Sequence, residues 1–558
     1  MRAGTGWLAA GLLAASFSPS VTRPAGEADA DPRSTIAVVV ETSRHPWLQR
    51  ANLSDVAHEL RDLYPAGAGE PIWFAEGRPA PALQSTVQVI GEGATLGLDP
   101  ADFDSRRLAE AAGSAAGGGA SSGRDRALLD VALSVEWMRF LSAAHRGRIA
   151  SPHAGRGADL PARPMDLPRL VRETRAGGDP AAVLASVEPR YPGYARLKAA
   201  LARHRALAAT SSLPIVDPVT KVEPGTAWIG IPAVRARLAA LGDLPTPASP
   251  PAEPDLYDPA LADAVRRFQD RHALAADGVL GKKTVEAMNV PAARRARQVE
   301  LSLERWRWLP DPGRRVVVVE LPRAELWAID MERGTTDVHM RAVVGESRSH
   351  ATPMLAASIS AVVFRPYWVP PPGILKEEIL PRVRARPEWL AGHGMEIVAR
   401  PEENAETFAP TEDVLSRVAR GELTLRQRPG PKNDLGAVKF VVPDAQCIAM
   451  HGTPYGRLFD LPQRDRSHGC IRLEDPHALA RWILGEEPGW DPGRIAEAAG
   501  RERSTTVKLR EPVPVVFVYG TATVDPDGTE HFVEDIYRLD AQAEVQLAQQ
   551  APPARVGG

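Results

Sequence analysis

The sequence predicts a multidomain α+β protein: a helical N-terminal half that includes a small three-helix module, followed by a β-rich domain with a helical insertion. Three observations lead to this prediction. The chain has 558 residues, whereas one hydrophobic core rarely serves more than about 250–300 residues. Apolar residues recur at helical spacing up to about residue 290. After residue 314 the pattern changes to short β-branched runs separated by turn residues.

Composition and charge are those of a globular protein. Hydrophobic residues make up 44% and charged residues 25% of the chain, both ordinary values. The formal net charge of −3 excludes a globally basic nucleic-acid binder, so we expect no nucleic-acid partner. The 52 prolines, about 9% of the chain against a usual ~5%, mark turns and linkers. Two cysteines, Cys447 and Cys470, are too few for a disulfide scaffold.

Residues 1–30 are predicted to form a signal peptide or an N-terminal anchor. Arg2 precedes an apolar run from Trp7 to Phe17, which small and polar residues follow. Such a run fits the apolar core of a signal peptide and is shorter than the ~20 residues that span a bilayer. We therefore expect export, with cleavage or retention as an N-terminal anchor both open. No later stretch reaches membrane-spanning length.

Residues 40–215 are predicted to be a helical scaffold domain. Its strongest helix is expected from Asp125 to His145, where apolar residues fall on or near one face. The preceding segment, Gly113 to Gly123, is rich in Gly, Ala and Ser and is predicted to be a flexible loop. This half contains no acid pair, metal cluster or nucleophile motif, so we expect it to be structural.

Residues 222–295 are predicted to form a module of three short helices. Gly242 stands where the first helix should end, and Asp258 with Pro259 has the pattern of an N-cap followed by the first helical residue. A turn at Asp277-Gly278 precedes the third helix, which Pro291 ends. The apolar faces of the first two helices are Val234, Leu238, Leu241, Leu261, Val265 and Phe268.

Residues 300–542 are predicted to be the β-rich domain, and residues 543–558 a disordered tail. Two helical stretches, Ile374 to Arg386 and Thr411 to Arg420, interrupt the strands and predict a cap insertion at about 374–432. The expected strands are Arg315 to Glu320, Glu325 to Asp330, Val338 to Val344, Ile359 to Phe364, Ala437 to Val442, Ile448 to Met450 and Val513 to Tyr519.

The densest group of chemically competent residues lies between His451 and Arg472. A thiol becomes a good nucleophile only as a thiolate, so Cys470 needs a basic or cationic neighbour. His451 ends a different strand, from which it could face Cys470, whereas His468 is close in sequence and usually points elsewhere. Gly469 allows a tight turn whose amides could face an oxyanion. Arg472 could hold a substrate carboxylate or stabilise the thiolate.

Three other interpretations of these residues remain open. Cys447 and Cys470 could form a disulfide in an oxidising compartment, although Cys447 is more simply a small buried hydrophobe. The two cysteines with His451 and His468 have the residue types of a zinc site. On one strand, however, Cys447 and His451 would lie about 13 Å apart, too far for tetrahedral ligands, and we expect no metal. His468 could be only a packed histidine.

Two sets of motifs resemble known families. Residues 228–290, with Val265-Arg266-Arg267-Phe268-Gln269 and Asp277-Gly278-Val279, resemble a peptidoglycan-binding domain. Ser467-His468-Gly469-Cys470 with His451-Gly452 resembles the YkuD-type L,D-transpeptidases, and four further motifs resemble their large Gram-negative, YcbB-like branch. These motifs are Thr352-Pro353, Tyr367-Trp368-Val369-Pro370-Pro371, Arg426-Gln427-Arg428-Pro429-Gly430 and Asp535-Ile536-Tyr537.

The resemblance implies a cysteine acyltransferase. Cys470 would be the nucleophile, and His451 the general base, oriented by the carbonyl of Gly452. The amides of Gly469 and Cys470 would form the oxyanion hole, and further residues would line the substrate pocket. The donor and acceptor would be stem tetrapeptides of peptidoglycan, joined by 3→3 cross-links. The pocket residues are Ser467, His468, Arg472, Tyr367 and Trp368, and those of the peptidoglycan-binding module are Phe268, Gln269, Asp277 and Gly278.

The resemblance implies no cofactor and allows penicillin-binding proteins as partners. Two departures from the family pattern bear on donor preference: Glu320 replaces the usual Asn, and Thr453 directly follows Gly452 without an intervening acid.

Two other functions stay open. With water or a lipoprotein lysine as acceptor, the same site would be a carboxypeptidase or an anchoring enzyme. A non-enzymatic wall-binding scaffold is the alternative of a different class.

Overall fold

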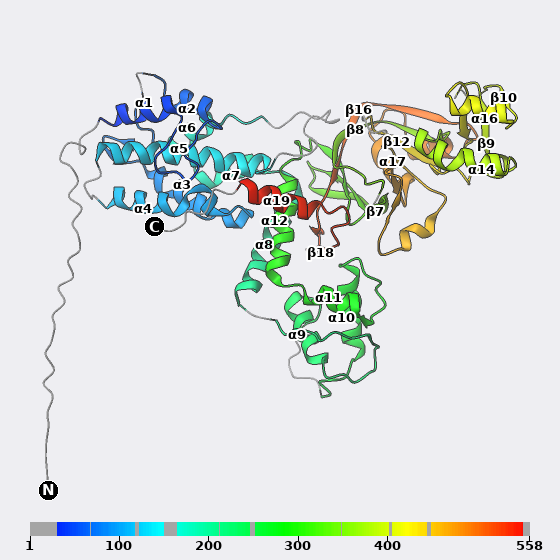
Figure 1. The fold of residues 1–558 in the computed structure, drawn as a ribbon, viewed down its shortest axis with the longest axis horizontal. Coiled ribbons are helices and arrows are strands. Elements are labelled where there is room, and N and C mark those ends of the chain that lie inside the picture. Colours follow the sequence, from blue (N-terminus) through cyan, green and yellow to red (C-terminus); the bar gives the residue numbers. More distant parts are fainter. Residues whose placement is uncertain are drawn as a thin grey trace, which may run out of the picture.

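The computed structural model describes residues 31–66, 69–117, 122–149, 164–210, 213–245, 252–347, 349–400, 404–443 and 448–550. The predicted signal or anchor and Cys447 lie outside these residues. Figure 1 shows a helical lobe at the left, a β-rich lobe at the right and a three-helix module below. Within the described residues, no helix has the length and apolar character needed to cross a membrane.

The helical lobe is built around α5 (Gly123–Arg146), which is buried on nearly all sides. Ser122 and Asp125 cap its N-terminus reciprocally, which places the start of the helix close to the predicted Asp125. Its neighbours are α1 (Pro32–Thr42), α2 (Ala57–Leu63), α3 (Pro81–Gly91), α4 (Ser105–Ala116), α6 (Leu167–Arg175), α7 (Pro180–Val187) and the short pieces β1 (Phe74–Ala75), β2 (Arg78–Pro79), η1 (Gly93–Leu96) and η2 (Pro100–Phe103). One hydrophobic core joins these elements.

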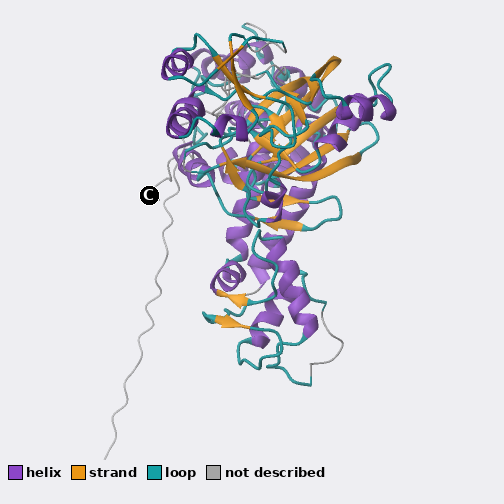
Figure 2. Cartoon of the chain, turned by 90° about the vertical axis from the view of Figure 1, so that its right-hand side faces the viewer, coloured by secondary structure: helices purple, strands orange, loops and turns teal. Residues whose placement is uncertain are grey.

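Two long helices, α8 (Pro192–Thr210) and α12 (Ala292–Trp306), connect the three-helix module to the rest of the chain, as Figures 1 and 2 show. It contains α9 (Ile231–Leu241), α10 (Pro259–Asp270) and α11 (Lys282–Asn289), with a small β-ladder of β3 (Lys221–Val222) and β4 (Leu280–Gly281). Gly242 ends α9 at φ 85°, and the Asp258 side chain accepts a hydrogen bond from the Leu261 amide at 2.8 Å. Both predicted caps are confirmed.

The β-rich lobe is a nine-stranded mixed sheet in the order β14-β7-β15-β13-β12-β8-β16-β5-β6. Because β6 also pairs with β7, the sheet closes on itself. The strands are β5 (Arg315–Glu320), β6 (Glu325–Asp330), β7 (Thr335–Gly345), β8 (Leu355–Phe364), β12 (Val438–Val441), β13 (Met450–His451), β14 (Asp465–Ser467), β15 (Ile471–Leu473) and β16 (Thr505–Val518). The first two match the predicted bounds residue for residue.

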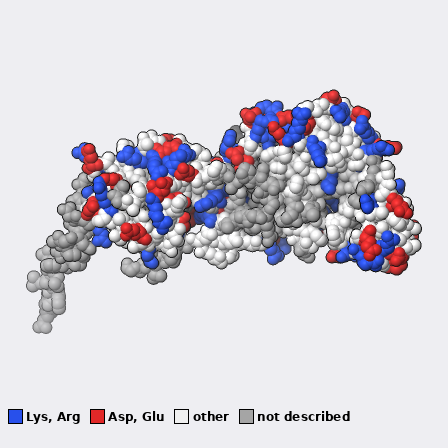
Figure 3. Space-filling view, turned by 90° about the horizontal axis from the view of Figure 1, so that it is seen from above, with Lys and Arg blue, Asp and Glu red and all other residues white. Residues whose placement is uncertain are grey.

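Helices cover both faces of this sheet, as the burial of every residue of β5 requires. Val317 and Val319 belong to the core that includes α17 (Pro476–Leu484) and α18 (Pro492–Gly500). Val316 and Val318 face the other way and pack with residues of α8 and α12. The sheet is therefore attached to the helices that carry the three-helix module. Figure 3 shows acidic and basic side chains interspersed over the upper face of the molecule.

The cap insertion is an α/β subdomain and not the purely helical one that we predicted. An antiparallel sheet in the order β10-β9-β11 accompanies its helices, and the cap has its own hydrophobic core. These strands are too short and too polar to stand out in the sequence. The elements are α13 (Pro372–Ile374), a π-helical turn η3 (Leu375–Ile379), α14 (Leu380–Ala385), α15 (Trp389–Gly392), β9 (Met395–Val398), β10 (Thr407–Phe408), α16 (Glu412–Ala419) and β11 (Thr424–Gln427).

The chain finishes, within the described residues, in helix α19 (Leu539–Gln550), which follows the hairpin of β17 (Ala522–Val524) and β18 (Glu530–Phe532). The prediction of a disordered tail from residue 543 is therefore wrong for residues 543–550. Ala543 and Leu547 are buried and form a small core with Ile149 and Leu301. Figure 1 shows α19 between the helical and β-rich lobes, beside α12. Tertiary contacts stabilise a helix whose polar sequence does not predict it.

Candidate active site

The candidate base lies on strand β13, and the candidate nucleophile directly precedes the neighbouring parallel strand β15. In the register of β13 and β15, Met450 is opposite Ile471 and His451 is opposite Arg472. The Ile471 amide donates to the Ala449 carbonyl at 3.0 Å, so the pairing begins directly after Cys470. Met450 and Ile471 face the hydrophobic core. Because side chains alternate along a strand, His451 and Arg472 face away from that core. Extended by one residue before Ile471, the same alternation directs Cys470 to their side of the sheet.

His451 is held in one orientation and is poised to accept a proton. Its ring is 4% exposed, and Nδ1 lies 2.6 Å from the carbonyl oxygen of Gly452. A carbonyl only accepts hydrogen bonds, so Nδ1 carries the proton. The pKa of His451 is lowered to about 4, mainly by burial and also by the charges of Arg472 and Lys439, against the Gly452 hydrogen bond that raises it. At neutral pH Nε2 is therefore unprotonated.

Gly452 is held in place by a backbone hydrogen bond and by close packing. Its amide donates to the Val438 carbonyl of the next strand at 2.9 Å. A Cβ at this position would lie 3.1 Å from Pro476 and 3.5 Å from the backbone of Gly436, so a larger residue would displace one of these neighbours. The carbonyl that orients His451 is thus part of the sheet and its packing.

The turn that carries Cys470 is held by hydroxyl groups. The buried Ser467 hydroxyl donates to the Cys470 carbonyl at 2.6 Å and accepts from the Gly469 amide at 3.1 Å. Gly469 has φ +107°, a conformation that L-residues rarely adopt. Cys470 itself is half-buried. In this structure the Gly469 amide donates to Ser467, and the expectation that it lines an oxyanion hole stays a prediction.

A second hydroxyl, that of Thr352, ties this turn to the end of β7. Thr352 is 1% exposed, and its hydroxyl donates to the Gly469 carbonyl at 2.8 Å and accepts from the Gly345 amide at 2.8 Å. The Tyr537 hydroxyl donates to the Gly345 carbonyl at 2.7 Å. Thr352 and Tyr537 belong to the family motifs, but nothing in the sequence relates them to the turn that carries Cys470.

His468 points away from the core of the sheet and contacts the cap. Its Nε2 atom lies 2.8 Å from Oε1 of Glu378, in the π-helical turn of the cap. Its ring also lies beside that of His350, with centroids 4.7 Å apart. The expectation that His468 is directed elsewhere than its neighbour Cys470 agrees with this geometry. Glu378 was missed, because the sequence holds no signal that relates it to a turn ninety residues later.

Arg472 forms a polar group with Tyr455 and Asp434 beside His451. The Arg472 guanidinium carbon lies 5.7 Å from the centroid of the Tyr455 ring, which is 49% exposed. Burial raises the pKa of Asp434, against the effects of Tyr455 and Arg472. This group places a cation and hydrogen-bonding atoms on the same side of the sheet as Cys470.

Tyr367 and Trp368 lie at the base of the cap. Trp368 exchanges backbone hydrogen bonds with Gln427 at 3.1 and 2.7 Å, and its side chain packs against the cap core. The Arg426 guanidinium lies 4.3 Å from the centroid of the Tyr367 ring and pairs with Glu396 at 2.7 Å. Both aromatic residues thus connect the cap to the sheet, and their predicted place in the substrate groove stays a prediction.

The residues singled out in the three-helix module are structural. Phe268 is fully buried and Gln269 is 1% exposed. The Gln269 amide nitrogen donates to Asp277 at 2.9 Å, and its oxygen accepts from the Gly278 amide at 2.8 Å. Phe268 stacks on His272 with ring centroids 3.9 Å apart. The prediction that Phe268 and Gln269 contact a wall polymer is therefore wrong, since neither side chain reaches the surface.

Within the described ranges, no three His, Cys, Asp or Glu side chains converge in the way a metal ion requires. The disulfide and zinc interpretations both involve Cys447, which lies outside those ranges. His451 and His468 have protein partners, the Gly452 carbonyl and the Glu378 carboxylate. The site thus offers a thiol, a neutral imidazole and a guanidinium, the groups needed for acyl transfer through a thioester.

Three domain families match successive parts of the chain. Residues 58–201 match a scaffold domain, residues 230–288 match a "Putative peptidoglycan binding domain", and residues 314–515 match the YkuD L,D-transpeptidase catalytic domain. The chain therefore contains a YkuD-type L,D-transpeptidase catalytic domain together with a peptidoglycan-binding domain. Cys470, His451 and the cap all lie within the catalytic match, so the predicted resemblance is confirmed at the level of the domains.

Two individual proteins are similar to parts of the chain. A "Putative L,D-transpeptidase" of Haemophilus influenzae is 28% identical over 276 residues, which are 48% of this chain and 54% of that protein. The chain thus spans about half the length of this curated relative. A crystal structure of the L,D-transpeptidase from Xylanimonas cellulosilytica (residues 123–326) covers 54% of this chain and 98% of its own, with 16% identity. Its TM-score of 0.16 is too low to bear on the fold.

Proposed function

We propose that this protein is a peptidoglycan L,D-transpeptidase in which Cys470 is the nucleophile and His451 is the general base. The observation that carries the proposal is that His451 lies on β13 and that Cys470 directly precedes the adjacent parallel strand β15, inside the matched catalytic domain. The neutral His451, with Nδ1 bonded to Gly452, supports the role of Nε2 as proton acceptor.

In the first step the thiol proton passes to Nε2 of His451, and Sγ attacks the carbonyl carbon of the L,D bond in a tetrapeptide stem. The substrate is the bond between the L-centre of meso-diaminopimelate and the terminal D-Ala. The tetrahedral intermediate collapses, the C–N bond breaks, and the D-Ala amine leaves with the proton from His451. A thioester on Cys470 remains. Arg472, on the same side of the sheet, offers a cation for the negative charge of donor or intermediate.

In the second step a diaminopimelate side-chain amine of another stem attacks the thioester. His451 takes a proton from this amine, the C–S bond breaks, and the Cys470 thiolate is regained as the new amide forms. The product is a 3→3 cross-link. These two steps need no cofactor, since each one only exchanges one bond to the acyl carbon for another.

Peptidoglycan as substrate places the protein in the periplasm, consistent with the predicted signal or anchor at residues 1–30. The peptidoglycan-binding domain supports contact with the same polymer. Penicillin-binding proteins, which would supply acceptor strands, are proposed partners. Asp277 is the exposed member of the residues singled out in that domain, and its contact with polymer remains a proposal.

The decisive experiment is intact mass spectrometry after treatment with a carbapenem, a β-lactam that acylates a transpeptidase cysteine. We expect one β-lactam equivalent on the wild-type chain and none on folded Cys470→Ala. Cross-linking activity in Cys470→Ala would overturn the proposal. Sacculus binding without any carbapenem adduct would favour the wall-binding scaffold instead.

The acceptor is tested by incubating the protein with tetrapeptide muropeptides and reading the products by mass spectrometry. A dimer with loss of D-Ala identifies transpeptidation. Tripeptide alone identifies water as the acceptor, and modification of a lipoprotein lysine identifies an anchoring reaction. Activity that survives a chelator would remove the zinc alternative.

A further inference from the structure

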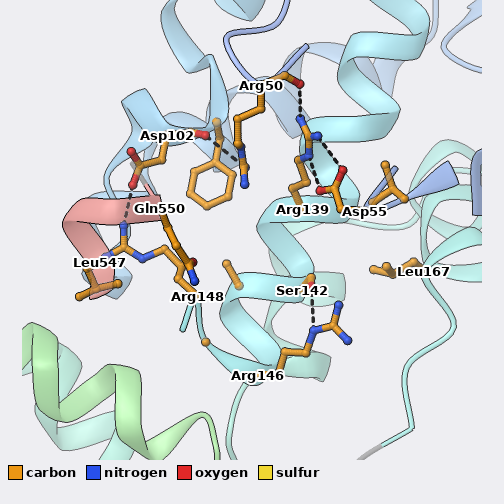
Figure 4. Close-up of a pocket in the computed structure, with 14 residues that line it drawn as sticks. Arg50, Asp55, Asp102, Arg139, Ser142, Arg146, Arg148, Leu167, Leu547 and Gln550 are labelled. Carbon is orange, nitrogen blue, oxygen red and sulfur yellow. Dashed lines mark hydrogen bonds and ion pairs between the residues drawn. The ribbon is translucent and has the colours of Figure 1, made fainter. Parts of the chain in front are cut away.

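A cavity of about 190 Å³ lies in the helical lobe, where the C-terminal end of α5 meets α19. Figure 4 shows its walls: α5, the 3-10 helix η2, the segment that holds Arg50, and α19, which contributes Leu547 and Gln550. No residue of the candidate active site lines it. Because α19 comes from the distant C-terminal part of the chain, the cavity forms only when that helix is docked on the helical lobe.

Charge at the cavity is predominantly positive. Its lining includes the guanidinium groups of Arg50, Arg139, Arg146 and Arg148, against the carboxylates of Asp55 and Asp102. The C-terminal carbonyls of α5 offset about half a charge. With that offset, the lining carries a charge of about +1.5, and of about +0.5 when the buried Glu136 that binds Arg139 is counted. The space is partly enclosed, so electrostatic attraction there exceeds that in water.

The two carboxylates are already used by two of the arginines. Arg139, which is buried, binds Asp55 through two hydrogen bonds of 2.9 and 2.8 Å. It also binds Glu136 at 2.8 Å. Arg148 pairs with Asp102 at 2.6 Å. Figure 4 shows both pairs at the edges of the cavity.

Arg50 and Arg146 are left with weaker partners. The nearest carboxylate oxygen to Arg50 belongs to Glu136, at 3.9 Å, and Arg50 donates to the Asp102 carbonyl at 3.3 Å. Arg146 donates through Nε to the Ser142 hydroxyl at 2.8 Å. Among the residues that the structure describes, no carboxylate pairs with Arg146. Burial also raises the pKa of Glu136 to about 7, which reduces the negative charge available to Arg50.

We propose that this cavity binds a phosphate-type dianion, with Arg50 and Arg146 as its main ligands. A guanidinium presents its N–H groups in a fork that matches two oxygens of a phosphate. The Ser142 hydroxyl and the Gln550 amide supply neutral donors in the same lining. The phosphate could be free or part of a lipid headgroup, since both present the same oxygens.

A neighbouring cavity of about 460 Å³ shares Asp102, Arg148 and Leu547 with the first. The two cavities are therefore adjacent, on either side of the Asp102–Arg148 pair. The site also has a structural consequence. Asp540 of α19 binds Arg305 at 2.6 Å and Thr521 at 2.5 Å, so an anion that holds α19 against the helical lobe would strengthen the link to the β-rich lobe.

The test uses the full chain and isothermal titration calorimetry with sodium phosphate, sodium diphosphate and sodium acetate at constant ionic strength. We expect saturable binding of the first two and much weaker binding of acetate. Replacing both ligands, Arg50→Gln with Arg146→Gln, should weaken binding at least tenfold, because each charge-assisted bond contributes about one factor of ten. Arg106→Gln is the matched control, since this side chain is 94% exposed on α4 and lies outside the lining.

Flotation with phosphatidylglycerol and phosphatidylcholine vesicles distinguishes the sources of the phosphate. Binding to phosphatidylglycerol that the double variant loses assigns a lipid headgroup, and binding of inorganic phosphate alone assigns a free or soluble phosphate. Thermal unfolding of the wild-type chain gives a readout that needs no variant: the Tm should rise with phosphate and not with chloride. Failure of both calorimetry and flotation, or binding that the double variant and Arg106→Gln change equally, overturns the proposal.

Discussion

Nε2 of His468 lies 2.8 Å from Oε1 of Glu378, which joins the turn that carries Cys470 to the cap. The two residues are far apart in the sequence and lie on two parts of the domain, the sheet and the cap, that have separate hydrophobic cores. Glu378 lies in a π-helical turn, a rare conformation that is frequent at functional sites. The contact therefore adds a polar link between the cap and the turn that carries the candidate nucleophile.

Glu378→Gln should loosen this contact. Both side chains are about one-third exposed or more, at 32% and 42%, so solvent screening limits the expected loss to about 0.2–1 kcal/mol, or up to ~5-fold in acylation rate. Carbapenem acylation kinetics measure the rate, and hydrogen exchange of residues 372–427 measures the cap. The control is Glu377→Gln, an exposed neighbour. An equal effect of both substitutions would show that the contact is irrelevant.

The acid limb of the pH–rate profile, where the rate of acylation falls as the pH decreases, should lie well below the pKa of an ordinary histidine. Burial lowers the pKa of His451 from 6.5 to about 4, so this base stays neutral as the pH falls from 7 to about 5 and is lost only near 4. The profile of carbapenem acylation between pH 4 and 8 measures this limb. A limb near pH 6.5 that depends on His451 would contradict the prediction.

The same lowered pKa makes stability depend on pH. The unfolded chain binds a proton at His451 below pH 6.5, whereas the folded chain does so only near pH 4. The stability that this residue contributes is therefore complete above pH 6.5 and falls as the pH decreases to 4, by up to about 3 kcal/mol. Denaturant unfolding at pH 7 and pH 4.5 should show a smaller difference for His451→Gln than for the wild type. Identical differences would disprove the assignment.

Thr352→Val should weaken both the fold and the site. The substitution removes one hydrogen bond to the Gly469 carbonyl and one from the Gly345 amide in a buried position, at a cost of about 1–3 kcal/mol. Denaturant unfolding and carbapenem acylation both measure it. Thr506→Val, on the exposed part of β16, should change neither quantity. Unchanged acylation in folded Thr352→Val would show that Cys470 does not depend on this support.

Gly469→Ala should impair acylation through backbone strain. Gly469 has φ +107°, while the nearest atom to an added Cβ is 3.7 Å away, so conformation and not space opposes the substitution. The expected cost is about 1–3 kcal/mol, relieved by a shift of the turn that carries Cys470. Gly456→Ala is the control, since it has an open surrounding and no positive φ. Carbapenem acylation equal to the wild type would contradict this prediction.

Local patterns predicted the regular elements well. The runs Arg315–Glu320 and Glu325–Asp330 form strands with the predicted bounds, because buried strands in a closed sheet need continuous apolar residues. The caps at Gly242 and Asp258 also follow from local chemistry. The cap strands and α19 were missed because their stability comes from contacts with distant segments, which leave little trace in short polar sequences.

The sequence by itself determined the domain order, most strands of the catalytic domain and the candidate pair Cys470 and His451. These features depend on residue type and local spacing, which a linear chain displays directly. Tertiary structure alone decided that Glu378 meets His468, that the Gly469 amide is occupied by Ser467, and that Phe268 and Gln269 are buried. It also brought α19 against α5 to form the arginine-lined cavity. Each of these relationships depends on long-range packing, in which the position of one side chain follows from the burial of many others.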